Sequence, residues 1–139
     1  MNTRTLKKHL KYKILQIRLA ILREPTSEPL PAIRTPNDLE QYLEPMKHLS
    51  EEHFVALHLD ARNQVTGYHV VSHGTVSASL VHPREVFKAA ILNNAYCVVV
   101  AHNHPAGSTD PSREDLDTTR QLIAAGSGFC IIIAWLLFG

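Results

Sequence analysis

A chain of 139 residues fits one domain, and this length is sufficient to bury a single sizeable core. With 45% hydrophobic and 19% charged residues, the composition excludes a disordered or fibrous protein. The formal net charge of +1 favours no particular partner. The longest apolar run, residues 129–138, falls well short of the roughly 20 residues that a transmembrane helix needs, so we expect no membrane span.

The two cysteines, Cys97 and Cys130, are too few for a disulfide framework or a cysteine-based zinc site. Both lie in apolar runs, where cysteine behaves as a small hydrophobic residue. The basic N-terminus contains no continuous apolar stretch and therefore fits a signal peptide poorly. These features together predict a cytoplasmic protein.

Residues 1–30 are predicted to form a basic amphipathic helix followed by a proline-rich linker. Seven basic residues precede the first acidic one, Glu24, and apolar residues recur every three or four positions between Arg4 and Arg23. The helix could contact nucleic acid or another acidic surface, but a solvated arm packed by its apolar stripe is the simpler interpretation. Prolines between Pro25 and Pro31 mark the boundary, so the main domain is expected to span residues 31–139.

The first half of that domain is expected to contain a helix followed by strands. Thr35 and Pro36 provide an N-cap and a first-turn proline for a helix with these residues on one face: Leu39, Tyr42, Leu43 and Met46. Alternation predicts a strand over Glu52–Leu59, and turn residues then lead into a second strand over Val65–Val71. A third short strand is predicted after Gly74, ending near Val81.

The second half alternates between helices and strands. A helix is predicted from Pro83 to Asn93-Asn94, with Val86, Phe87, Ala90 and Ile91 towards the core. A valine-rich strand is predicted over Tyr96–Ala101 and is typical of a central strand buried on both faces. Ser112 is predicted to open another helix, which Gly126 ends. The residues at helical spacing along it are Leu116, Thr119, Leu122 and Ile123. A last strand over Ile131–Leu137 completes an α/β order of elements.

Two histidines lie at the end of the valine-rich strand, which Pro105 terminates because it cannot donate to a sheet ladder. His102 and His104 are two positions apart, so both imidazoles project from one face, with α-carbons about 6.5 Å apart. Asp115 lies in the first turn of the next predicted helix and can point back towards them. Two neutral imidazoles and one carboxylate suit a catalytic zinc ion that keeps a fourth position for water. The sequence therefore predicts a zinc site formed by His102, His104 and Asp115.

Each part of this pattern also has a simpler interpretation. A single histidine at a strand end is usually a hydrogen-bonded surface residue, and Ser112 with Asp115 has the form of an ordinary helix capping box. The joint pattern is much more specific than its parts. The other seven histidines show no spacing that suggests a second metal site.

Three segments carry a resemblance to a known family: His102-Asn103-His104-Pro105-Ala106-Gly107, Pro111-Ser112-Arg113-Glu114-Asp115 and His82-Pro83-Arg84-Glu85-Val86-Phe87. They resemble the RadC-like branch of the JAB/MPN (JAMM) metalloproteases, and the similarity extends from about residue 31 to about residue 126. The resemblance implies a mixed α/β sheet flanked by helices, with a cytidine-deaminase-like architecture. It also implies that the two histidines and the aspartate hold zinc. An upstream glutamate, which completes the site in the family, corresponds to Glu52.

The resemblance implies hydrolysis of a peptide or isopeptide bond in a peptide or protein substrate. Zinc would activate a water molecule and polarise the carbonyl, and Glu52 would accept the proton from the water and pass it to the leaving amine. Ser112 could donate a hydrogen bond to the oxyanion. Glu51 is adjacent to Glu52, but neighbours on a strand face opposite sides, and the phase of Phe54 favours Glu52.

The C-terminal residues depart from the family pattern, which continues with a strand ending in Asp-His. This chain instead reads Cys130-Ile-Ile-Ile-Ala134-Trp135 and then Leu-Leu-Phe-Gly139. We therefore expect a truncated or altered end, an incomplete sheet and an exposed apolar edge. The alternative function is a non-catalytic MPN-like interaction module that binds a partner, or DNA through the basic arm.

Overall fold

The computed structural model describes residues 2, 4–5, 31–74, 81–107, 110–128 and 132–138, and of the last segment it describes the main chain. Residues 6–30, which hold most of the predicted N-terminal helix and the proline linker, lie outside these residues, as does the strand expected between Gly74 and Val81. No helix within the described ranges is long and apolar enough to cross a bilayer.

The centre of the fold is a four-stranded mixed sheet with the strand order β2-β1-β3-β4. Its strands are β1 (Glu52–Leu59), β2 (Val65–Gly74), β3 (Cys97–Asn103) and β4 (Ile132–Phe138). Strand β1 pairs antiparallel with β2 and with β3, whereas β3 and β4 run parallel. A parallel pair needs a crossover connection, which α4 (Arg113–Ser127) provides. The mixed α/β fold implied by the resemblance is confirmed.

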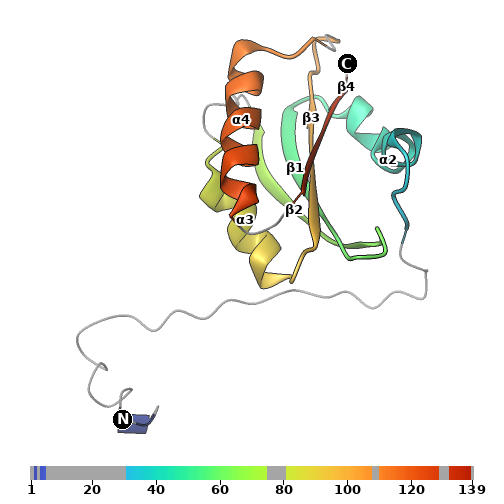
Figure 1. The fold of residues 1–139 in the computed structure, drawn as a ribbon. Coiled ribbons are helices and arrows are strands. Elements are labelled where there is room, and N and C mark those ends of the chain that lie inside the picture. Colours follow the sequence, from blue (N-terminus) through green and yellow to red (C-terminus); the bar gives the residue numbers. More distant parts are fainter. Residues whose placement is uncertain are drawn as a thin grey trace.

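Figure 1 shows α2 on one face of the sheet and α3 and α4 on the other. Helix α2 (Pro36–Tyr42) begins at the N-cap Thr35, whose side chain accepts a hydrogen bond from the Asp38 amide at 3.2 Å. A 3₁₀ helix, η1 (Glu44–His48), follows. One continuous helix was expected here, but Pro45 has no amide hydrogen and clashes with the preceding turn, so the α-helix ends before it.

The core on the α2 face joins this helical segment to the odd-numbered residues of the sheet. The buried members are Leu39, Leu43, Met46, Val55, Leu57, Leu59, Val65, Cys97, Val99 and Ala101. Tyr42 was expected to share this face but is 41% exposed, because the chain turns into η1 directly after it.

The core on the opposite face lies beneath α3 (Pro83–Leu92) and α4. Its buried members are Phe54, Ala56, Val81, Val86, Phe87, Ala90, Val98, Val100 and Leu122. Even-numbered residues of β1 and β3 therefore face the two helices, and odd-numbered residues face α2. Ile91, expected in this core, is instead 49% exposed near the end of α3.

Helix α4 is rotated relative to the face that its apolar residues predict. Leu116 and Ile123, expected in the core, are 45% and 55% exposed, and Thr119 is half-buried. The buried residues of the helix are Asp115, Thr118, Leu122 and Gly126. The helix thus turns a carboxylate inward at its first turn and leaves two large apolar side chains outside.

Candidate metal centre

The two histidines project from the end of β3 towards α4. The histidines were predicted at the end of the strand, and β3 does continue through Asn103, because His102 pairs with Phe54 of β1 and Asn103 pairs with Phe138 of β4. His102 is 4% exposed, and its ring meets the ring of His104 edge-on, with a centroid separation of 4.8 Å. The predicted same-face arrangement of the two imidazoles is therefore present.

Asp115 reaches the histidines from the N-terminus of α4. Ser112 is the N-cap, and its hydroxyl accepts a hydrogen bond from the Asp115 amide at 3.1 Å. In return, the Ser112 amide donates to Asp115 Oδ2 at 2.8 Å, which completes a capping box. This reciprocal pair fixes the direction of the Asp115 side chain, which is 1% exposed.

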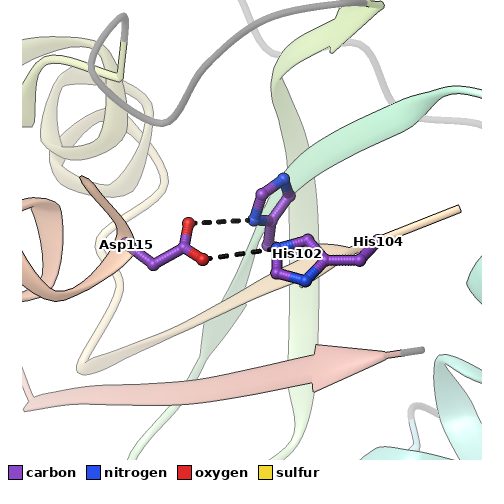
Figure 2. A group of neighbouring side chains, drawn as sticks. All are labelled: His102, His104 and Asp115. Atoms are coloured by element: carbon purple, nitrogen blue, oxygen red, sulfur yellow. Dashed lines mark ion pairs between the residues drawn. The ribbon is translucent and has the colours of Figure 1, made fainter. Parts of the chain in front are cut away.

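The Asp115 carboxylate faces both imidazoles, as Figure 2 shows. Its Oδ1 lies 3.3 Å from His102 Nδ1, and its Oδ2 lies 3.3 Å from His104 Nε2. One ligand atom from each of the three residues can be chosen so that all lie within 4.8 Å of one another. Among the described residues this is the one group of three histidine, cysteine or acidic side chains that close together. The group could hold a metal ion.

Two buried atoms in this group lack a hydrogen-bond partner, and they face each other. They are His102 Nδ1 and Asp115 Oδ1. A buried carboxylate without compensation is costly, and the lone pair of a neutral imidazole repels a carboxylate oxygen. A bound cation satisfies both atoms at once. The donor set therefore fits a metal ion.

Glu52 opens β1 on the same face of the sheet as the histidines. Its Oε2 lies 3.5 Å from His102 Nε2, and its side chain is 36% exposed. The neighbouring Glu51 points elsewhere, because its side chain is 60% exposed and lies 3.9 Å from His73. The alternation of the strand thus brings Glu52, and not Glu51, to the metal group. Its role as the base stays a prediction.

Ser112 is exposed at the N-terminus of α4. The described hydrogen bonds of its hydroxyl and its amide are those of the helix cap, and both join it to Asp115. The predicted donation from its hydroxyl to a substrate oxyanion stays a prediction.

The sequence analysis assigned no role to one buried polar residue close to the site. Asn103 lies between the two histidines in sequence and is 2% exposed, on the α2 side of the sheet. Its side chain bonds to main-chain atoms on both sides of Glu52. The available signal was a buried amide inside an apolar strand, because such a group needs partners.

Comparison with known proteins assigns the family. The RadC-like JAB domain matches residues 33–134, which is most of the chain. The chain belongs to the RadC-like JAB domain family. This confirms the resemblance carried by the His102–Gly107 and Pro111–Asp115 segments.

Several members of the RadC-like family are closely similar to this chain. A UPF0758 protein of Geobacillus thermodenitrificans is 50% identical over 95 residues, covering 68% of this chain and 42% of that protein. A UPF0758 protein of Symbiobacterium thermophilum is 53% identical over 92 residues, covering 66% and 39%, respectively. One of Methanococcoides burtonii is 42% identical over 102 residues, covering 73% and 44%. The chain spans less than half the length of these relatives.

Proposed function

We propose that this RadC-like JAB domain is a zinc-dependent hydrolase of a peptide or isopeptide bond. The observation that carries the proposal is the buried Asp115 carboxylate, 3.3 Å from an imidazole nitrogen of each of two histidines, with the Glu52 carboxylate 3.5 Å from the nearer ring. Two imidazoles and a carboxylate are a typical catalytic zinc set, which leaves one coordination position open.

The kinds of donor atom support zinc. Zinc commonly takes imidazole nitrogen and carboxylate oxygen, at about 2.0–2.2 Å. The two nitrogen–oxygen separations of 3.3 Å involve different oxygens of Asp115, and one ligand atom from each of the three residues lies within 4.8 Å of the others. His102, His104 and Asp115 would therefore move closer together to hold the ion.

The zinc ion, Glu52 and Ser112 have separate roles in the proposed reaction. A zinc ion held here supplies activation of a water molecule and polarisation of the scissile carbonyl. Glu52 accepts the proton of the attacking water and delivers it to the leaving amine, a contribution of roughly 10²–10⁴-fold in rate. Its partial exposure lets the carboxylate meet both solvent and substrate. Ser112 donates its hydroxyl hydrogen to the developing oxyanion.

The first experiment measures the metal. Purified protein should contain one zinc per chain by elemental analysis, and it should cleave either a degenerate fluorogenic peptide library or a lysine-linked isopeptide. Chelation should abolish cleavage, and added zinc should restore it. Protein that binds no zinc, with or without added metal, would contradict the proposal.

The second experiment tests the base with a matched pair of variants. Glu52→Gln should retain zinc and lower kcat by roughly 10²–10⁴-fold, because the amide cannot accept the proton. Glu51→Gln, adjacent but turned away, should cleave at close to the parent rate. Equal activity of Glu52→Gln and the parent would refute the assignment of Glu52.

The alternative is a non-catalytic module that binds DNA or a protein partner through the basic arm. Protein that carries no metal and still binds duplex DNA in a salt-dependent manner would favour it. The cytoplasmic location also stays a prediction.

A further inference from the structure

The Asn103 side chain is bonded to the main chain of β1 on both sides of Glu52. Its Oδ1 accepts a hydrogen bond from the His53 amide at 2.6 Å, and its Nδ2 donates to the Glu51 carbonyl at 3.0 Å. Both bonds join residues about fifty positions apart in the chain. The amide is almost fully buried, so its two partners replace the water that it would otherwise bind.

These two bonds extend the sheet beyond the point where its backbone ladder stops. The β1–β3 pairing ends at Phe54 and His102, and the next rung would join His53 to Asn103. At that rung the main chain of Asn103 pairs with Phe138 of β4. A primary amide has the same donor and acceptor as a peptide group. The Asn103 side chain therefore takes the place of a peptide unit and closes the missing rung.

The other edge of this segment is held less regularly. Glu52 pairs with Gly74 of β2, but the register between β1 and β2 shifts between Phe54 and Val55. The first residues of β1 thus lie between an irregular ladder on one side and the Asn103 amide on the other. Loss of the amide would leave them anchored by β2 alone.

We propose that Asn103 is the positioning residue for Glu52, and that its two main-chain hydrogen bonds hold the glutamate backbone at the rung where the carboxylate meets His102. The inference rests on the proposed function, in which Glu52 is the base. Asn103 lies on the α2 face and the histidines on the opposite face. Asn103 therefore acts through β1 and does not contact the metal group.

Asn103→Ala should leave the metal in place and slow the chemistry. A misplacement of about 1 Å in a catalytic group can lower the rate by roughly 10²-fold, so we expect kcat to fall about 10- to 100-fold with KM nearly unchanged. Zinc content and zinc affinity should equal those of the parent, because all three ligands remain. Asn37→Ala, an exposed position on α2, is the matched control and should change neither value.

Amide hydrogen exchange tests the same claim without a substrate. The His53 amide should be protected in the parent and should exchange at least about tenfold faster in Asn103→Ala, whereas the amides of Ala56 and Leu57 keep their protection. Asn103→Asp keeps the acceptor for His53 but loses the donor to Glu51, so it should restore most of the His53 protection. Unchanged His53 exchange in Asn103→Ala would overturn the inference.

A double-mutant cycle separates positioning from a general structural role. If Asn103 acts through Glu52, Asn103→Ala should lower the residual kcat of Glu52→Gln by less than about twofold, because interacting residues are non-additive. A full additive loss would overturn the positioning role and leave the hydrolase proposal standing. Parent activity in Glu52→Gln would overturn the assignment of Glu52 as the base and, with it, the positioning role of Asn103, whereas a parent protein that binds no zinc would overturn the hydrolase proposal.

Discussion

Two pairs of histidines, each with one buried and one half-buried member, lie near opposite ends of β1. One is the metal group of His102, His104 and Asp115, next to Glu52. The other contains His58, which is 3% exposed and bonded to Asn93 at 3.0 Å, and the nearby His69. Both contain imidazole nitrogens without a hydrogen-bond partner, namely His102 Nδ1 in the first, and His58 Nε2 and His69 Nδ1 in the second.

The two groups differ in the residues that surround the histidine rings. Carboxylates face the rings of the first group, whereas an amide and a second imidazole act on His58. Burial, and secondly the charge of His69, lower the pKa of His58 to about 4. Burial and a neighbouring imidazole thus favour a neutral structural histidine, whereas the carboxylates that face the rings of the first group favour a bound cation.

The largest expected effect distinguishes the groups by metal binding. His102→Ala and Asp115→Asn should each weaken zinc binding by at least about 100-fold, more than is typical for loss of an outer-sphere partner. His58→Gln and Asp117→Asn, the latter exposed on the same helix as Asp115, should bind zinc like the parent. Competition with a chromophoric chelator measures these affinities. Weaker binding in His58→Gln would show that the second group also holds metal.

The second effect is a pH dependence that belongs to the His58 group. The folded-state pKa of about 4 lies below the ordinary value of 6.5, so between these pH values the unfolded chain binds more protons. The free energy of unfolding should therefore decrease as pH falls from about 6.5 to about 4. Urea unfolding of metal-free protein should show a shallower decrease for His58→Gln. Parallel curves for the two proteins would contradict this origin.

The smallest effect concerns the helix that carries Asp115. Ser112→Ala removes the hydroxyl that accepts a hydrogen bond from the Asp115 amide. This substitution should lower the free energy of unfolding by about 1 kcal/mol. Ser112→Asp retains a capping oxygen and should restore most of that stability, although it cannot donate to an oxyanion. Urea midpoints check the stability, and a shared loss of hydrolysis in both variants would assign the hydroxyl a second role.

Much of the metal group could be predicted because it depends on the spacing of residues that are close together in the sequence. The spacing of His102 and His104, the helix start at Ser112 and the alternation that selects Glu52 all depend on short-range periodicity. The end of β3 could also be predicted, because Pro105 cannot donate to a sheet ladder, and pairing with β1 and β4 continues through Asn103. Asn103 was missed because its partners depend on the register of a strand fifty residues away.

The rotation of α4 shows the limit of apolar periodicity. Leu116 and Ile123 favour one helix face, but the helix packs on the face that includes Asp115 and Leu122. The capping box with Ser112 and the approach to both imidazoles fix that orientation. A few specific polar contacts thus outweigh an apolar stripe that sequence alone cannot distinguish from a core face.

The three side chains that could hold a metal ion come from residues 102–115, whereas Glu52 comes from a different strand. The two parts are joined by Asn103, which lies within the first segment and bonds to the main chain on both sides of Glu52. A one-residue slip of β1 would turn Glu52 away from His102, but it would also exchange the side chains that fill the cores on the two faces of the sheet. The packing of β1 therefore ties the side of the sheet on which Glu52 lies to the stability of the whole domain.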